Sequence, residues 1–273
     1  MTKGRTLTGI AFEVAADPAA PGLPVVLLHA GVADGRMWDP VWDDLVDDRV
    51  VLRLDLRGYG DSTALPIGPL VHHLDVLATM DAVGIGRAHI VGASMGAGVA
   101  VEICLVEPAR VASLMLAGPG GSLIEHPSEW LSAVWRAEVD ALKAGDLDTA
   151  VEADLRAWVD GPSREPREVD PEVRALVGEM QRRAFEVTAD WGDVGEDELD
   201  PPALARLGEV PAPTLVLVGD GDGDAIIEVA ELLADQVPDA KLVRWPGVAH
   251  LPSMERPAEF VVLVREWLAS NDD

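Results

Sequence analysis

Short apolar runs alternate with longer amphipathic segments along most of this chain, and this rhythm restricts the folds that it can adopt. Runs typical of buried strands cover residues 24–29, 50–55, 88–91, 111–116, 213–218 and 241–245. Helical patterns cover residues 37–46, 70–83, 94–106 and 257–270. Because strands alternate with helices, we expect an α/β fold whose central sheet is mostly parallel and flanked by helices.

The alternation stops between residues 121 and 208, where the pattern is helical, poor in strands and interspersed with tryptophans. We therefore predict a core domain made of residues 1–120 and 209–273, interrupted by a helical cap, or lid, at 121–208. Insertions above the strand ends often cover a binding site and move during turnover. We expect this cap to be mobile and to determine which substrates are accepted.

Composition excludes several classes of partner. The chain has 48 acidic and 21 basic residues, a net charge of -27, so its surface repels phosphate backbones and anionic lipid. Cys104 is the only cysteine, so no internal disulfide can form. Residues 1–14 lack a long apolar stretch and no apolar run reaches about 18 residues, so we expect neither a signal peptide nor a membrane-spanning helix. We expect a cytoplasmic protein, a monomer or homodimer, that binds neither nucleic acid nor membranes.

A nucleophile motif follows the third apolar run. Gly92-Ala93-Ser94-Met95-Gly96 fits the pattern G-x-S-x-G, with a predicted strand before it and a predicted helix after it. This context is that of a nucleophile elbow, in which small neighbours let strand and helix approach and the helix N-terminus faces developing negative charge. The alternative, a glycine-rich helix start with a capping serine, does not require the preceding strand.

A serine nucleophile needs a base, and the base needs a carboxylate to orient it. His250 lies in a loop between the last predicted strand and the last helix. Residues 219–224 alternate glycine and aspartate after the preceding strand, and we select Asp222 as the orienting acid with Asp220 as the reserve. This loop lacks the closing glutamate of a calcium loop, so we expect no metal and no cofactor.

Further segments complete a family resemblance. They are Leu28-His29-Ala30-Gly31, the D-x-R-G-x-G-x-S loop at 55–62, the acid turn at 219–222 and the histidine loop at 247–257. With the serine motif, they resemble the α/β-hydrolase superfamily. The 37–40 segment and the cap length are weakly similar to 3-oxoadipate enol-lactonases and related small esterases. The resemblance implies an oxyanion hole formed by the backbone N–H groups of Gly31 and Met95, and a structural role for His29.

The expected function is a serine hydrolase that cleaves a carboxylic ester or lactone of a small molecule through an acyl-enzyme. Trp38, Trp135 and Trp158 are expected to line the substrate pocket. A C–C bond hydrolase, a non-hydrolytic cyclase or isomerase, and a ligand-binding protein with an unused triad remain alternatives. A dehalogenase is excluded, because that chemistry in this fold needs a carboxylate at position 94.

Overall fold

One mixed sheet forms the centre of the computed structural model, which describes residues 1–15, 21–47 and 49–272. Within these residues it has eight strands in the order β1-β2-β4-β3-β5-β6-β7-β8. The strands are β1 (Thr2–Arg5), β2 (Ala11–Ala15), β3 (Val25–Leu28), β4 (Val51–Leu54), β5 (Ala88–Ala93), β6 (Val111–Ala117), β7 (Thr214–Gly219) and β8 (Ala240–Trp245). β1, β2 and β4 pair antiparallel, and every pair from β4 to β8 is parallel. The predicted α/β class with a mostly parallel sheet is confirmed.

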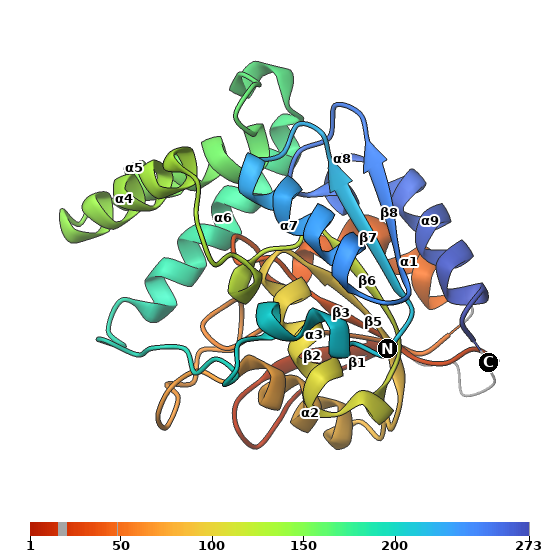
Figure 1. The fold of residues 1–273 in the computed structure, drawn as a ribbon. Helices are drawn as coiled ribbons and strands as arrows, with labels where there is room; N and C mark the ends of the chain where they lie inside the picture. Colours follow the sequence, from red (N-terminus) through yellow and green to blue (C-terminus); the bar gives the residue numbers. More distant parts are fainter. Residues whose placement is uncertain (16–20, 48, 273) are drawn as a thin grey trace.

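Helices cover both faces of this sheet (Figure 1). They are α1 (Asp39–Val46), α2 (His72–Ala82), α3 (Met95–Val106), α4 (Glu129–Lys143), α5 (Leu147–Asp154), α6 (Pro171–Thr188), α7 (Asp224–Gln236), α8 (Pro252–Glu255) and α9 (Pro257–Ala269). Short 3₁₀ turns are η1 (Gly35–Trp38), η2 (Pro108–Arg110), η3 (Gly121–Leu123), η5 (Pro166–Glu168) and η6 (Ala203–Glu209), and η4 (Leu155–Asp160) is a π-helical turn. α1 and α9 pack together on one face, while α2, α3 and α7 lie on the other.

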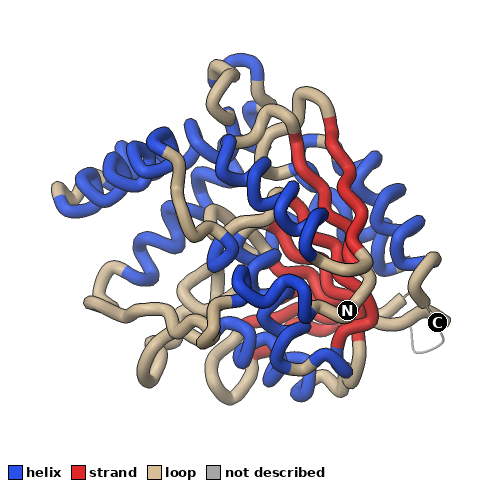
Figure 2. The backbone as a smooth tube through the Cα atoms, in the orientation of Figure 1, coloured by secondary structure: helices blue, strands red, loops and turns tan. Residues whose placement is uncertain are grey.

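The middle of the sheet is buried on both faces. Every residue of β5, β6 and β7 is buried, as the continuous apolar runs of these strands predict. Figure 2 shows the strands as one twisted layer between two layers of helices. The carboxyl ends of these parallel strands share one edge, so the loops that follow β3, β5 and β7 meet there.

The segment between β6 and β7 is helical, as predicted. It contains α4, α5 and α6; α4 packs against α5, α5 packs against α6, and the α4–α5 pair extends away from the sheet (Figure 1). The helix starts follow from local sequence, since Ser128 caps α4 by accepting the Leu131 N–H and Asp170 caps α6 by accepting the Glu172 N–H. That residues 121–208 act as a separate cap domain stays a proposal.

Two elements lie outside the predicted pattern. The β1–β2 hairpin has no apolar alternation in β1, all of whose residues are exposed, so periodicity gave no signal there. α7 buries Ala225, Ile226, Val229, Ala230 and Leu233, a helical spacing that the prediction overlooked. In the described part of the chain, no helix combines the length and the apolar character needed to cross a bilayer.

Candidate active site

Ser94 occupies a strained turn between β5 and α3. Its φ of 51° makes it the only non-glycine residue with positive φ in the described ranges 1–15, 21–47 and 49–272. The turn is held because the Ser94 N–H donates to the Ala117 carbonyl at 2.9 Å. A Cβ on Gly96 would lie 2.4 Å from the Leu28 carbonyl oxygen, so glycine lets α3 start directly against β3. The serine side chain is thereby presented at the carboxyl edge of the sheet.

His250 joins Ser94 to Asp222 through two hydrogen bonds. His250 Nε2 lies 2.7 Å from Ser94 Oγ, and His250 Nδ1 lies 2.8 Å from Asp222 Oδ2. His250 is 1% exposed and Asp222 is 4% exposed. A buried carboxylate opposite Nδ1 favours the tautomer with its proton on Nδ1, which leaves Nε2 free to accept the serine proton. Such a pair of hydrogen bonds can pass the proton of the serine hydroxyl to the imidazole.

The two neighbouring aspartates contact other groups. Asp220 Oδ1 accepts the Gly247 N–H at 2.5 Å, and Asp224 Oδ1 accepts the Ala225 N–H at the start of α7. The acid loop and the histidine loop approach closely, since a Cβ on Gly219 would lie 2.0 Å from the Val248 carbonyl oxygen. Of the three carboxylates in this loop, the structure therefore brings Asp222 to His250.

Gly31 and Met95 flank the serine from two different elements. Gly31 follows β3, and Met95 is the first residue of α3; a Cβ on Gly31 would lie 3.7 Å from Met95 Cβ. In the described turns and loops, neither N–H group has a backbone acceptor. Met95 also lies at the positive end of the α3 dipole. These two N–H groups are therefore available to stabilise an oxyanion beside Ser94.

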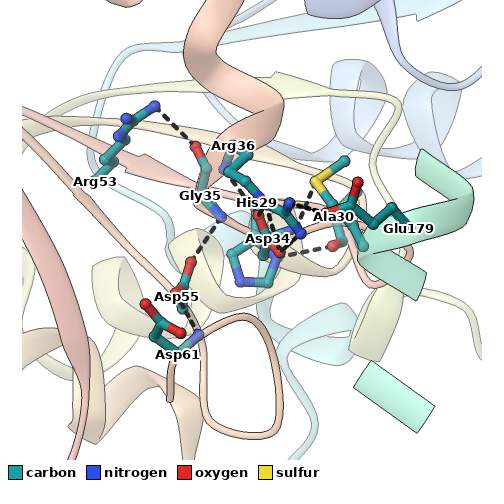
Figure 3. A network of polar contacts seen from close by, with 10 residues as sticks. His29, Ala30, Asp34, Gly35, Arg36, Arg53, Asp55, Asp61 and Glu179 are labelled. Carbon is teal, nitrogen blue, oxygen red and sulfur yellow. Dashed lines mark hydrogen bonds and ion pairs between the residues drawn. The ribbon is translucent and has the colours of Figure 1, made fainter. Parts of the chain in front are cut away.

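A network of polar contacts that includes His29, Gly35 and Asp55 is shown in Figure 3. His29 is fully buried; its Nε2 accepts the Leu56 N–H and its Nδ1 donates to the Ala30 carbonyl, each at 2.8 Å. Burial lowers the pKa of His29, so the neutral ring persists. Asp55 accepts the Gly35 N–H at 2.8 Å. Because both ring nitrogens bond to the backbone, His29 orders the turn and is not free to act as a base.

A cavity of about 310 Å³ lies over Ser94 and His250. It is lined by residues of the core loops and of the α4–α6 segment: Gly31, Val32, Arg57, Gly58, Tyr59, Leu70, His72, Ser94, Trp135, Glu138, Asp154, Trp158, Gln181, Ala184, Phe185, Thr188, Trp191, Glu196 and His250. Trp135 and Trp158 thus lie where the sequence analysis expects them. The Trp158 ring is centred 4.5 Å from the His250 ring.

Trp38 does not line this cavity, so its expected place in the pocket is wrong. It is fully buried and packs against Phe260 of α9, with ring centres 6.1 Å apart. Trp38 is part of the same cluster of buried apolar residues as Phe260, so it belongs to the hydrophobic core.

Several polar residues of the cavity wall were not predicted, and three of them lie close together in the α4–α6 segment. Glu138, Asp154 and Gln181 come from three successive helices, α4, α5 and α6. No motif connects them, because their proximity depends on how these helices pack. The nearest sequence signal is the spacing of Asp154 and Trp158, one helical turn apart and on the same side of the chain.

Comparisons with known proteins agree with the observed fold. A family model described as alpha/beta hydrolase fold matches residues 24–257. The chain is 28% identical to a pimeloyl-acyl-carrier-protein methyl ester esterase of Chromobacterium violaceum, over 90% of this chain and 94% of that protein. It is 27% identical to a 2-hydroxy-6-oxo-6-phenylhexa-2,4-dienoate hydrolase of Burkholderia cepacia, over 95% and 92% of the two chains. The solved enol-lactonase from Burkholderia xenovorans LB400 shares the fold, with a TM-score of 0.76, 24% identity and coverage of 95% and 96%.

Proposed function

Because the chain belongs to the alpha/beta hydrolase fold family, we propose that it is a serine hydrolase that cleaves a carboxylic ester or lactone of a small molecule through an acyl-enzyme. The observation that carries this proposal is the pair of hydrogen bonds from Ser94 to His250 and from His250 to Asp222. Esterases and C–C bond hydrolases both occur among the chain's relatives, so the family alone does not choose between them.

In the proposed reaction, Ser94 Oγ attacks the carbonyl carbon while His250 Nε2 removes its proton. Asp222 holds the imidazole and stabilises its protonated form. The Gly31 and Met95 N–H groups bind the oxyanion, a contact whose loss typically costs about 3 kcal/mol in the barrier. His250 then protonates the departing alcohol, and water, activated by the same histidine, releases the acid and restores Ser94.

The charges of the cavity favour an ester or lactone over the anionic dienoates named for some relatives. Arg57 is the only arginine or lysine on the cavity wall in the described residues, and Asp75 binds its guanidinium at 2.6 and 2.8 Å. Glu138 and Asp154 lie on the same wall. A substrate carboxylate would therefore meet carboxyl groups and no uncommitted cation.

The cap is part of the proposal. Residues 121–208 contribute Trp135 and Trp158 to the cavity, and the Trp158 ring packs at a tilt against the His250 ring. We infer that this segment selects the acyl group and excludes water from His250 while the substrate is bound.

The experiment is turnover of p-nitrophenyl butyrate and of small lactones by the wild type and by Ser94→Ala. We expect the variant to lose activity by about 10⁴-fold or more while its circular dichroism and melting temperature stay close to those of the wild type. Ser270→Ala, a change at an exposed serine, is the control and should retain full activity. Equal rates for Ser94→Ala and the wild type would contradict the proposal, as would a wild type that hydrolyses neither compound class.

A further inference from the structure

Two carboxyl groups of the cap face the same cavity as Ser94. Glu138 lies on α4, and Asp154 ends α5; Asp154 is only 2% exposed although it lines the cavity. The two carboxyl groups interact, so that the pKa of each depends on the other. Gln181 of α6 supports the pair, since its Nε2 donates to Asp154 Oδ2 at 2.8 Å. We call Glu138, Asp154 and Gln181 the cap triad of acceptors.

One acceptor of this group has no donor. Gln181 is 6% exposed and lines the cavity, and within the part of the chain that the structure describes its Oε1 receives no hydrogen bond. A buried acceptor without a donor is costly, so its position beside the cavity indicates that a ligand supplies the donor. Glu138, Asp154 and Gln181 thus place three side chains with acceptor oxygens, each from a different helix, on the wall of one cavity.

The rest of the wall suits a cation. Tyr59, Trp135, Trp158, Phe185 and Trp191 line the same cavity, and aromatic faces attract ammonium groups. The net charge of -27 raises the local concentration of cations at the surface.

The basic groups on the wall have acidic partners. Arg57 is bound by Asp75, and His72 Nε2 lies 3.8 Å from Glu196 Oε1. A cationic ligand therefore meets no uncompensated positive charge there.

We propose that the cap triad of acceptors is a subsite for a primary ammonium group, so that the ester or lactone cleaved at Ser94 carries an aliphatic amine. A primary ammonium has three N–H donors and can bond to a carboxylate, a second carboxylate and an amide oxygen together. Cleavage of an amine-bearing substrate at Ser94 rests on the proposed function. Binding of the amine by the cap triad of acceptors does not depend on that function.

The protonation of the pair agrees with this role. Burial, followed by repulsion from Glu138, raises the pKa of Asp154 to about 8. Burial also raises the pKa of Glu138. The empty pair therefore retains a proton near neutral pH, and a bound ammonium replaces that proton, which is released to solvent. Tyr59, His72, Glu196, Arg57 and His250 are the other titratable groups facing this cavity.

The first test measures binding without catalysis. Hexylammonium chloride and 1-heptanol, a neutral alcohol with one more methylene group, are titrated into Ser94→Ala by calorimetry in two buffers of different ionisation enthalpy, which reports proton release. We expect hexylammonium to bind about 10-fold or more tightly than heptanol with release of a proton, and Glu138→Gln, in the same background, to remove this preference. Asp140→Asn makes a like change at an exposed site of α4, outside the cavity wall, and should keep the preference.

The second test measures selectivity with methyl 6-aminohexanoate and methyl heptanoate, which differ by an ammonium in place of a methyl group. The wild type should favour the amine in kcat/KM, and Glu138→Gln and Asp154→Asn should each abolish the preference. If Asp154→Asn does not fold, Glu138→Gln alone decides the outcome. Equal binding of hexylammonium and heptanol, or turnover of both esters without preference, overturns the subsite. Hexylammonium binding without turnover of either ester instead overturns the proposed function.

Discussion

Replacement of Asp222 by asparagine separates the role of its charge from its role in packing. Asp222 uses its two oxygens differently: Oδ1 accepts the Gly223 N–H at 2.7 Å, and Oδ2 faces His250 Nδ1 at 2.8 Å. In Asp222→Asn, the amide oxygen retains the Gly223 N–H only if the amide nitrogen faces His250. That nitrogen donates to Nδ1, so the imidazole proton moves to Nε2. A protonated Nε2 cannot accept the proton of Ser94.

We therefore expect Asp222→Asn to fold normally and to lose about 10⁴-fold in kcat, the loss typical of an orienting aspartate turned into its amide. This loss corresponds to about 5.5 kcal/mol in the barrier. The assay is release of p-nitrophenol from p-nitrophenyl butyrate at about pH 8, with the melting temperature measured on the same samples. Asp220→Asn and Asp224→Asn are matched controls in the same loop and should retain most of the rate, because their carboxylates contact backbone N–H groups.

Two results would refute this reasoning. An Asp222→Asn enzyme with more than about a tenth of the wild-type rate would show that the carboxylate does not set the tautomer of His250. Equal losses in Asp220→Asn would show that the wrong residue of the loop has been assigned to His250.

Three further predictions follow from the same geometry. Trp158→Ala and Trp135→Ala should each shift the preference among acyl chain lengths by about 10-fold while the rate on an acetate ester changes less, because each removes an aromatic wall of the cavity. Val139→Ala, at an exposed site of α4, is the control, and a chain-length profile equal to that of this control would contradict the prediction. Asp154→Asn should raise the melting temperature relative to the wild type by more at pH 8 than at pH 5. Because the pKa of Asp154 is raised, the folded wild type binds more protons than its unfolded chain between about pH 4 and 8, so its stability falls as pH rises, by at most about 1.4 kcal/mol per pH unit. A difference in melting temperature that does not depend on pH, measured by scanning fluorimetry, would disprove the assigned protonation. Gly96→Ala should lower the free energy of unfolding by about 2 kcal/mol or more, because its Cβ would lie 2.4 Å from the Leu28 carbonyl oxygen. The control Gly178→Ala meets only side chains, Leu155 at 3.3 Å and Val151 at 3.7 Å, and should change this free energy little. Equal effects of the two substitutions in urea titrations would argue against the elbow packing.

The parts of this structure that the sequence predicts are those with strong local signals. The central strands bury both faces, so each is a continuous apolar run whose ends are predicted to within a few residues. The turn at Ser94 requires small residues at fixed positions, and these form a motif of their own. The β1 strand is exposed and polar, and only its pairing with β2 defines it.

The cavity wall is less predictable, because packing between helices determines it. Trp38 follows the Gly31 turn closely in sequence, but its side chain packs in the core against Phe260. Glu138 and Asp154 meet because α4 packs against α5, and no spacing rule brings them together. A sequence therefore predicts residues fixed by backbone geometry better than residues that share a surface only through tertiary packing.

The central claim is that Ser94 is the nucleophile, and covalent capture tests it most directly. The wild type, Ser94→Ala and His250→Ala are treated with a fluorophosphonate, and intact-mass and peptide mass spectrometry locate the adduct. Our account predicts one adduct per wild-type chain, on the peptide that contains Ser94, no adduct in Ser94→Ala and greatly slowed labelling in His250→Ala. An unlabelled Ser94 in an enzyme that still hydrolyses p-nitrophenyl butyrate, or an adduct on another residue that abolishes this activity, would contradict it.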